Sequence, residues 1–272
     1  MGNCECNEHC RGVGKEGEAE SVKVVKLVGV APSFAKEPDR HAHVFENGAT
    51  YTGEWLGSLR DGYGVQVWPD GARYDGRWKD DKAHGRGRFQ HADGDVYDGE
   101  WLCDQAHGSG TYYHVDGSRY DGEWENDKQN GHGVELWADG AKYEGEYLDG
   151  RKHGTGLFTW PNGSQYKGEF VDNDFHGEGY YEWGDGRKYQ GQWKHSQMDG
   201  KGVSSWPDGR QYEGEYANGA KDGMGIFKWP DGREYNGLWK AGKQHGVGIS
   251  TSPDGEKTKA EWRDGQPEMS LD

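Results

Sequence analysis

The segment Tyr143-Glu-Gly-Glu-Tyr-Leu-Asp-Gly-Arg-Lys-His-Gly-Thr-Gly-Leu-Phe-Thr-Trp-Pro-Asn-Gly-Ser-Gln165 is one of nine consecutive copies of a 23-residue pattern. With its tyrosine counted as position 0, each copy has a glycine at position 2 and an aromatic ring at position 4. Further glycines follow at positions 11, 13 and 20. A fixed period marks a repeat protein, in which each unit is one supersecondary element stacked on its neighbours. The nine tyrosines are Tyr51, Tyr74, Tyr97, Tyr120, Tyr143, Tyr166, Tyr189, Tyr212 and Tyr235.

The repeated unit is predicted to be a β-hairpin. Tyr166-Lys-Gly-Glu-Phe170 alternates between two faces, as a strand does, and Gly156-Leu-Phe-Thr-Trp160 is predicted to be the second strand. Pro161-Asn162-Gly163 is predicted to be a tight turn, and the other eight copies carry Asp-Gly at the same place. The glycine at position 2 lies between two rings on one face, so we expect an aromatic side chain from a neighbouring strand to lie flat across it. The structural positions predicted in this way include Tyr51, Gly53, Trp55, Tyr74, Gly76, Trp78, Tyr143, Gly145, Tyr166, Gly168, Tyr235, Gly237 and Trp239.

This pattern resembles the MORN repeat, whose consensus runs Tyr-x-Gly-x-Trp, a short loop, Gly-x-Gly and an Asp-Gly turn. Nine full copies cover residues 51–257; a half copy precedes them at Phe45-Glu-Asn47-Gly48, and a degenerate copy follows at Thr258-Lys-Ala260-Glu-Trp262. The resemblance implies an elongated, single-layer antiparallel β-meander, and therefore an all-β fold. Members of the family are scaffolds in ciliary spokes, membrane junctions and the protist cytoskeleton, or non-catalytic extensions of lipid kinases and methyltransferases.

The composition is consistent with a single-layer sheet. Only 31% of residues are hydrophobic, which is low for a domain with a central core, and all 13 tryptophans and 16 tyrosines lie within the repeat region. In an array, each hairpin buries its rings on the next. The predicted organisation is a flexible, acylated tail and linker at 1–40, a repeat array at 41–264 (half repeat 41–50, full repeats 51–257, degenerate cap 258–264) and a C-terminal tail at 265–272.

The amino terminus, Met1-Gly2-Asn3-Cys4-Glu5-Cys6, has the acceptor pattern for myristoylation of Gly2. Cys6 replaces the usual Ser or Thr, and in this respect the start resembles some Src-family kinases. A single myristoyl chain binds a membrane only marginally, so a second signal is needed. Residues 1–40 hold six basic and seven acidic residues, which excludes a polybasic patch. Palmitoylation is the candidate second signal, and the predicted lipidation sites are Gly2, Cys4, Cys6 and Cys10.

Two alternatives remain open for this segment: an unmodified tail, and metal or disulfide chemistry by Cys4, Cys6, His9 and Cys10. A structural zinc site normally lies in a folded framework, and we expect none here. We also expect no secretory signal and no membrane-spanning helix, because no apolar run is long enough. Val22–Val30 is rich in β-branched residues and is either a short strand packed on the array or a docking strand for a partner.

The formal net charge of −16 excludes some classes of partner. Nucleic-acid binding requires a basic surface, and none is evident. The same charge argues against direct binding of anionic phosphoinositides by the repeats, since Lys and Arg are scattered among more numerous acidic residues.

The sequence predicts no enzyme, no cofactor and no metal site. His84, His107, His153, His176 and His245 recur at position 10, where other copies carry Asp or Asn. A catalytic base would be unique, so this position is predicted to be a solvated turn. Cys103 is likewise predicted to be a solvent-facing variant at the start of a loop.

We therefore expect a non-catalytic scaffold or adaptor that binds protein partners through the sheet face or edges. Myristoylation and palmitoylation would make it membrane-associated, so it would be cytoplasmic and peripheral on the cytosolic face of the plasma or ciliary membrane. The alternatives are a structural subunit of a cilium (axoneme) or the cortical cytoskeleton, and an accessory regulator of a separate phosphoinositide kinase. The sequence leaves assembly into homo-oligomers open.

Overall fold

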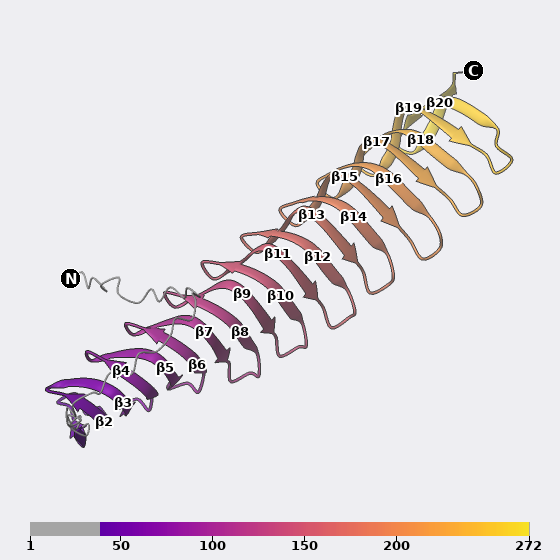
Figure 1. Ribbon diagram of the computed structural model, residues 1–272. Coiled ribbons are helices and arrows are strands. Elements are labelled where there is room, and N and C mark those ends of the chain that lie inside the picture. The colour runs from indigo at the N-terminus through magenta and orange to yellow at the C-terminus, as the bar shows by residue number, and fades with distance from the viewer. Residues whose placement is uncertain (1–38, 272) are drawn as a thin grey trace, which may run out of the picture.

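The structure, a computed structural model, describes residues 39–271, and every regular element in this range is a β-strand (Figure 1). The 21 strands form one sheet in which each strand pairs antiparallel with the next along the chain. Figure 1 shows a single elongated layer, with β2 (Thr50–Leu56) near one end and β20 (Lys257–Arg263) near the other. The predicted all-β antiparallel meander is confirmed.

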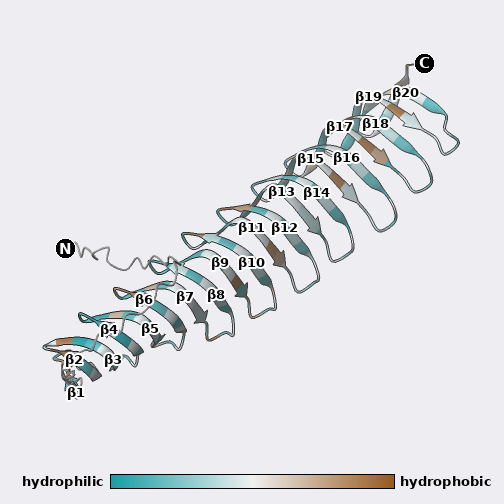
Figure 2. Cartoon of the chain, viewed as in Figure 1, coloured by the Kyte–Doolittle hydropathy of each residue, from teal (hydrophilic) through white to brown (hydrophobic). Residues whose placement is uncertain are grey.

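Each repeat contributes one strand of seven residues and one of nine. The seven-residue strands, besides β2 and β20, are β4 (Arg73–Lys79), β6 (Val96–Leu102), β8 (Arg119–Glu125), β10 (Lys142–Leu148), β12 (Gln165–Val171), β14 (Lys188–Lys194), β16 (Gln211–Ala217) and β18 (Glu234–Lys240). The nine-residue strands are β3 (Leu59–Val67), β5 (Lys82–Gln90), β7 (Gln105–Tyr113), β9 (Lys128–Leu136), β11 (Arg151–Thr159), β13 (Asp174–Glu182), β15 (Gln197–Ser205), β17 (Ala220–Lys228) and β19 (Lys243–Thr251). Figure 2 shows that hydrophilic residues predominate along the whole sheet, with short hydrophobic segments on individual strands.

Five-residue connections join one repeat to the next, and they contain the predicted Asp-Gly turns. In the connection after β3, Trp68 N donates to Ala72 O at 2.9 Å, and Ala72 N donates to Asp70 Oδ1 at 3.0 Å. Gly71 has a φ of 93°, a conformation that favours glycine. The aspartate therefore closes the turn with its side chain, and the glycine supplies the backbone conformation.

Two-residue turns join the two strands within each repeat. Between β4 and β5, Asp80 and Asp81 have φ values of 49° and 67°, and two positive values in succession are typical of a type I′ turn. Asp81 N also donates to Arg60 O of the preceding hairpin at 3.0 Å. These turns therefore also link adjacent hairpins by hydrogen bonds along one long side of the sheet, where the strands end.

A β-bulge explains the glycine at position 11. The pairing of β10 with β11 shifts register between Gly145 and Glu146, where Gly145 lies opposite Gly156 but Glu146 lies opposite His153, and Gly154 in β11 has a φ of 59°. Glu146 Oε1 accepts hydrogen bonds from Thr155 N at 3.0 Å and Thr155 Oγ1 at 2.8 Å. These bonds from Thr155 hold the pKa of Glu146 below its ordinary value. The bulge requires a residue that tolerates positive φ, and the carboxylate at position 3 satisfies its exposed N–H.

The second strand of each repeat is longer than predicted. β11 begins at Arg151, whereas the prediction began it at Gly156 and ended it at Trp160, which instead lies in the connection. The glycines at positions 11 and 13 do not flank the return of the hairpin, because both lie within this strand. The actual return is the two-residue turn, which in this chain accepts Asp, Asn, His, Ser, Ala and Cys.

The sheet also extends further at both ends than the predicted array. β1 (Asp39–Val44) begins before the predicted half repeat at 41–50 and pairs with β2. β21 (Gln266–Ser270) lies within the range 265–272 that was predicted to be a tail, and it pairs with β20. β1 therefore covers the edge of β2, the strand that follows it, and β21 covers the edge of β20, the strand that precedes it.

Gly145→Val should destabilise the array by about 3 kcal/mol, whereas Glu146→Val should cost only about 1 kcal/mol. A Cβ on Gly145 would lie 2.5 Å from Tyr143 Oη and 2.6 Å from Gly156 Cα. The side chain of Glu146 points to the opposite face, so its replacement removes only the hydrogen bonds to the bulge. Urea unfolding monitored by circular dichroism measures both variants, and equal midpoints would contradict this assignment of the faces.

Deletion of residues 143–165 should remove one whole repeat and leave the rest folded. The new junction joins Lys142 to Tyr166, which preserves the period, and stability in an array is approximately a sum of unit and nearest-neighbour terms. The β-sheet signal in far-ultraviolet circular dichroism should fall roughly in proportion to the residues removed. Complete loss of that signal would instead indicate a closed core.

Candidate functional site

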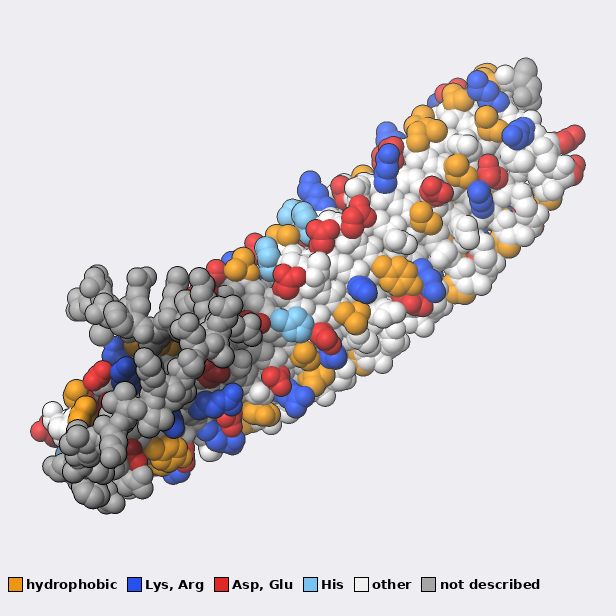
Figure 3. Space-filling view, viewed as in Figure 1, with side chains coloured by type: hydrophobic (Ala, Val, Ile, Leu, Met, Phe, Trp, Pro, Cys, Tyr) orange, Lys and Arg blue, Asp and Glu red, His pale blue; other side chains and the backbone are white. Residues whose placement is uncertain are grey.

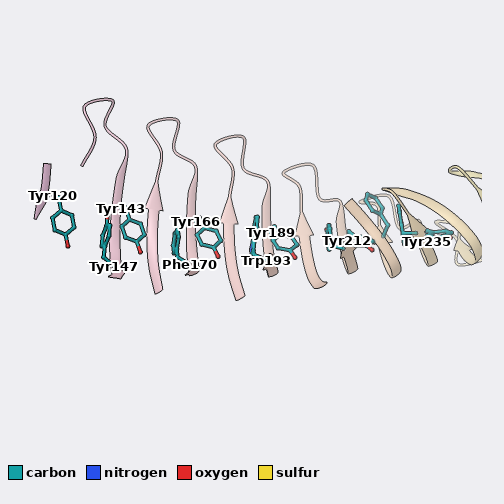
Figure 4. Close-up of a cluster of buried hydrophobic side chains, with 12 residues drawn as sticks. Tyr120, Tyr143, Tyr147, Tyr166, Phe170, Tyr189, Trp193, Tyr212 and Tyr235 are labelled. Carbon is teal, nitrogen blue, oxygen red and sulfur yellow. The ribbon is translucent and has the colours of Figure 1, made fainter. Parts of the chain in front are cut away.

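One face of the sheet carries a row of tyrosine rings (Figure 4). We call it the aromatic face, formed by the side chains at positions 0, 4, 9, 15 and 17 of each repeat. Tyr143 and Tyr166, both at position 0, are 0% exposed. Added Cβ atoms on Gly145 and Gly156 would lie 2.5 and 2.6 Å from Tyr143. The Tyr143 hydroxyl donates to Glu146 O at 3.0 Å, so each tyrosine covers two glycines and binds the backbone beyond them.

The ring over the glycine at position 2 comes from that glycine's own strand, not from a neighbouring strand as predicted. A tyrosine side chain is long enough to lie along its strand and reach the carbonyl three residues on. The prediction of a ring from a neighbouring strand describes the glycine at position 13 instead. The same arrangement places Tyr51 over Gly53, Tyr74 over Gly76, Tyr143 over Gly145, Tyr166 over Gly168 and Tyr235 over Gly237.

The rings at position 4 join these tyrosines into a ladder. Tyr143 makes edge-to-face contacts with Tyr147 of its own repeat at 5.3 Å and with Phe170 of the next repeat at 5.1 Å. Pairs of this kind contribute about 0.5–1.5 kcal/mol each beyond burial. Trp55, Trp78 and Trp239 stand at position 4 in their repeats, each in edge-to-face contact with the tyrosine of its own repeat. The ladder therefore couples every repeat to its neighbours.

Position 9 decides how far the aromatic face is filled. Its side chain lies opposite the ring at position 4, as Ala83 lies opposite Trp78. The residues at this position are Arg60, Ala83, Ala106, Gln129, Lys152, Phe175, Met198, Lys221 and Gln244. The two alanines fall in adjacent repeats, and there the face is hollowed into a cavity of about 620 Å³, which we call the aromatic groove. It is lined by Arg60, Gln66, Trp68, Tyr74, Trp78, Ala83, Phe89, His91, Tyr97, Trp101, Asp104, Ala106, Tyr112, Trp124 and Asp127.

Several polar groups of the aromatic groove are engaged by the protein itself. Arg60 Nε donates to Asp81 Oδ1 at 3.1 Å, and its guanidinium lies 4.0 Å from the centre of the Trp78 ring. Asp104 Oδ1 accepts a hydrogen bond from Ala83 N at 2.7 Å. The groove therefore presents mainly ring faces and apolar surface to a ligand.

The tyrosine hydroxyls of the groove are neutral at physiological pH. Burial raises the pKa of Tyr112 to about 12, and its hydrogen bond to Asp95 acts in the same direction. Burial likewise raises the pKa of Tyr74 and Tyr97 well above the ordinary value. The hydroxyls of Tyr74, Tyr97 and Tyr112 already donate their protons within the protein, to Arg77 O, Glu100 O and Asp95 Oδ2 respectively, and as neutral phenols they do not act as bases.

The prediction that position 10 is a solvated turn is wrong. His84, His107 and His153 lie within β5, β7 and β11, beside the bulge, and are half-buried. The Nδ1 atoms of His107 and His153 are buried and have no hydrogen-bond partner among residues 39–271. Cys103, predicted to face solvent, is half-buried at the first position of the turn after β6, with a φ of 54°.

Two further features of residues 39–271 bear on the function. No group of three or more His, Cys, Asp or Glu side chains in this range is arranged to hold a metal ion. The range also contains no helix of the length and apolarity needed to cross a membrane.

The face opposite the aromatic face is charged with both signs. Arg73 pairs with Asp75 at 2.7 Å, and Lys142 pairs with Glu144 at 2.7 Å. In Figure 3, acidic and basic side chains are interspersed on the visible surface, without a large region of one sign. Such a surface has no concentrated positive field for a polyanion.

The predicted lipidation sites Gly2, Cys4, Cys6 and Cys10 lie outside the described residues, as does Val22–Val30. Within the array, sequence reasoning missed position 9. The signal was available, because this position varies from Ala to Phe to Lys inside an otherwise strict repeat.

Comparisons with known proteins place the chain in a family. Solved structures with similarity include the TCP10 domain of Danio rerio CPAP in complex with a STIL peptide, at 14% identity, a TM-score of 0.44, and coverage of 86% of this chain and 99% of that one. Virginiamycin B lyase from Staphylococcus aureus matches at 11% identity, a TM-score of 0.15, and coverage of 84% and 71%. With TM-scores below 0.5, these likenesses support no conclusion about function. No curated protein matches the chain.

The MORN repeat model matches the chain nine times. The matched residues are 51–73, 74–96, 97–119, 120–142, 143–165, 166–186, 189–209, 212–232 and 235–257. These segments cover most of the chain and coincide with the repeats described above. The protein belongs to the MORN-repeat family.

Proposed function

We propose that this chain is a non-catalytic scaffold whose aromatic face binds an extended segment of a partner protein. The aromatic groove at Ala83 and Ala106 is the observation that supports this function. Aromatic surface in a hollow is a common anchor for partner side chains, because it offers a large contact area at little entropic cost. The rows of rings continue beyond the groove into the following repeats, so a bound segment can continue along the array.

A protein segment fits this face better than a nucleic acid or an anionic lipid. The net charge of −16 opposes polyanions, and Arg60, at the end of the groove, already binds Asp81. A cavity of about 620 Å³ can hold two or three side chains, but the face continues well beyond it. Backbone and side chains of an extended peptide match such a shape.

The second part of the proposal is a membrane tether at the amino terminus. Myristoylation of Gly2 would give weak, reversible membrane binding, and palmitoylation of Cys4, Cys6 or Cys10 would then hold the protein on the cytosolic face. Together, tether and groove would make the chain an adaptor that brings a partner to a membrane. The alternatives are assembly into a cilium or cortical cytoskeleton, and regulation of a separate phosphoinositide kinase.

Filling the aromatic groove should abolish partner binding without unfolding the array. Ala83→Met with Ala106→Met introduces the side chain that Met198 already places at position 9. Arg88→Met with Thr111→Met, on the opposite face of the same two strands, is the matched control. Peptides selected from a random displayed library against the full chain should bind the groove variant at least about ten-fold more weakly, and the control with unchanged affinity. Equal binding to the groove variant and the wild-type chain would overturn this part of the proposal.

Gly2→Ala should release the protein to the cytosolic fraction, because palmitoylation requires prior membrane contact. Cys4→Ser with Cys6→Ser and Cys10→Ser should leave it myristoylated but only weakly bound. Acyl labelling and fractionation measure both effects. Retention of the Gly2→Ala variant in a detergent-resistant axonemal or cortical fraction would favour the cytoskeletal alternative instead.

A further inference from the structure

Two repeats of the aromatic face share a constellation that the other full repeats lack. Position 4 is a tyrosine in two full repeats, at Tyr147 and Tyr216, and Trp or Phe in the others. In both of these repeats position 9 is a lysine, Lys152 in the first and Lys221 in the second. The two sites lie three repeats apart. In each, the ammonium group lies against a tryptophan at position 17 of the preceding repeat. The chain therefore contains two copies of one lysine-tyrosine-tryptophan site.

The first copy contains its own carboxylate. Glu135, at position 15 of the preceding repeat, accepts a hydrogen bond from Tyr147 Oη at 2.8 Å and pairs with Lys152 Nζ at 3.0 Å. The Lys152 ammonium also lies 4.7 Å from the Trp137 ring. The side chains of Lys152 and Glu135 are only 15% and 22% exposed, so the pair is largely sheltered from solvent. This copy is a complete, self-satisfied ion-pair site.

In the second copy, Ser204 stands where Glu135 stands in the first. Its Oγ lies 2.6 Å from Tyr216 Oη, so a hydroxyl group takes the place of the carboxylate as the hydrogen-bond partner of the tyrosine. Within residues 39–271, no carboxylate lies within ion-pair distance of Lys221. The adjacent Asp222 turns elsewhere, and its Oδ2 accepts a hydrogen bond from Ala241 N at 3.1 Å.

The Lys221 ammonium is held among rings. It lies 4.3 Å from the centre of Phe227, 4.8 Å from Trp239, 4.9 Å from Tyr212 and 5.1 Å from Trp206. Burial, with a smaller effect from Arg210, lowers the pKa of Lys221 to about 8, so the group is still mainly cationic at pH 7. Aromatic faces stabilise a cation but do not neutralise it. The site therefore holds a partly desolvated positive charge.

From the comparison of the two copies, we propose that Lys221, Tyr216 and Ser204 bind the carboxylate of an acidic side chain in a partner peptide, in the way that Lys152 and Tyr147 bind Glu135. This inference rests on the proposed function, because it assumes that the aromatic face binds an extended segment. It adds the chemistry that would determine the specificity of that segment: an Asp or Glu flanked by apolar residues.

The residues around Lys221 favour a carboxylate that belongs to a side chain in the middle of a bound peptide. Tryptophans at position 17 continue on both sides of Trp206, at Trp183 and Trp229, so flanking residues of a bound peptide have rings to contact in both directions. Arg210 lies close enough to Lys221 to lower its pKa, and it adds positive charge, although its Nε pairs with Asp208 at 2.7 Å. An acidic side chain thus meets the Lys221 ammonium and the hydroxyl pair of Tyr216 and Ser204 among aromatic rings.

The test uses the full chain and two pools of displayed nonapeptides that are randomised except at the central residue, fixed as Glu in one pool and Gln in the other. The wild-type chain should enrich the Glu pool over the Gln pool by about ten-fold, the value of one charge-assisted hydrogen-bonded contact. Ser204→Glu supplies the internal carboxylate of the first copy and should abolish this preference. Lys221→Met introduces the side chain that another repeat already carries at position 9, Met198, and should also abolish the preference for Glu.

The matched control is Ser250→Glu, the same substitution at position 15 of the ninth repeat, where no lysine follows at position 9 of the next unit. This variant should keep the preference for Glu, and circular dichroism should show that all three variants are folded. The inference would be overturned if the wild-type chain showed no preference for the Glu pool over the Gln pool. The same result is expected if a carboxylate from residues 1–38 or from a second copy of the chain already bound Lys221. Persistence of the preference in Ser204→Glu, or its equal loss in Ser250→Glu, would overturn it too. If both pools were enriched equally, and this enrichment were lost in the Ala83→Met, Ala106→Met variant, the proposed function would stand and only this inference would be contradicted.

Discussion

The fold depends on one recurring contact: a tyrosine ring that lies flat over two glycines and donates its hydroxyl to the backbone beyond them. Because the ring occupies the space of two absent side chains, it is fully buried in a sheet only one layer thick. The ring at position 4 then packs edge-on against the tyrosines of two successive repeats. A chain with 31% hydrophobic residues can be stable in this form because each repeat needs only its two neighbours.

The sequence predicts the parts of this structure that repeat without variation. The spacing of Tyr166, Gly168 and Phe170 is sufficient to identify a strand and its buried face, and the Asp-Gly dipeptides identify the turns between repeats. The sequence does not reveal the two-residue return, because a type I′ turn tolerates pairs as different as Asp80-Asp81 and His195-Ser196. It also hides the bulge, since the glycine at position 11 resembles a turn signal but lies within a strand.

The candidate binding features follow from variation inside the constant frame. Two adjacent alanines at position 9 hollow the aromatic face, whereas lysine at the same position places a cation on it. Such differences are visible in the sequence only as irregularities, and their meaning depends on knowing that position 9 faces the ring at position 4. Glu135 and Ser204 lie on different repeats from Tyr147 and Tyr216, the tyrosines that they hydrogen-bond, so the sequence alone could not associate them without the pairing of the strands.

The most direct test of this account is a double-mutant cycle between Tyr166 and Gly179. An added Cβ on Gly179 would lie 2.5–2.7 Å from three atoms of Tyr166, and the backbone of Gly179 does not itself exclude alanine. Gly179→Ala should therefore destabilise the wild-type array by about 2 kcal/mol but cost well under 1 kcal/mol in a Tyr166→Ala background. The account predicts this strong coupling in urea unfolding. Additive effects of the two substitutions would contradict it, because they would show that the ring does not depend on the space that the glycine leaves.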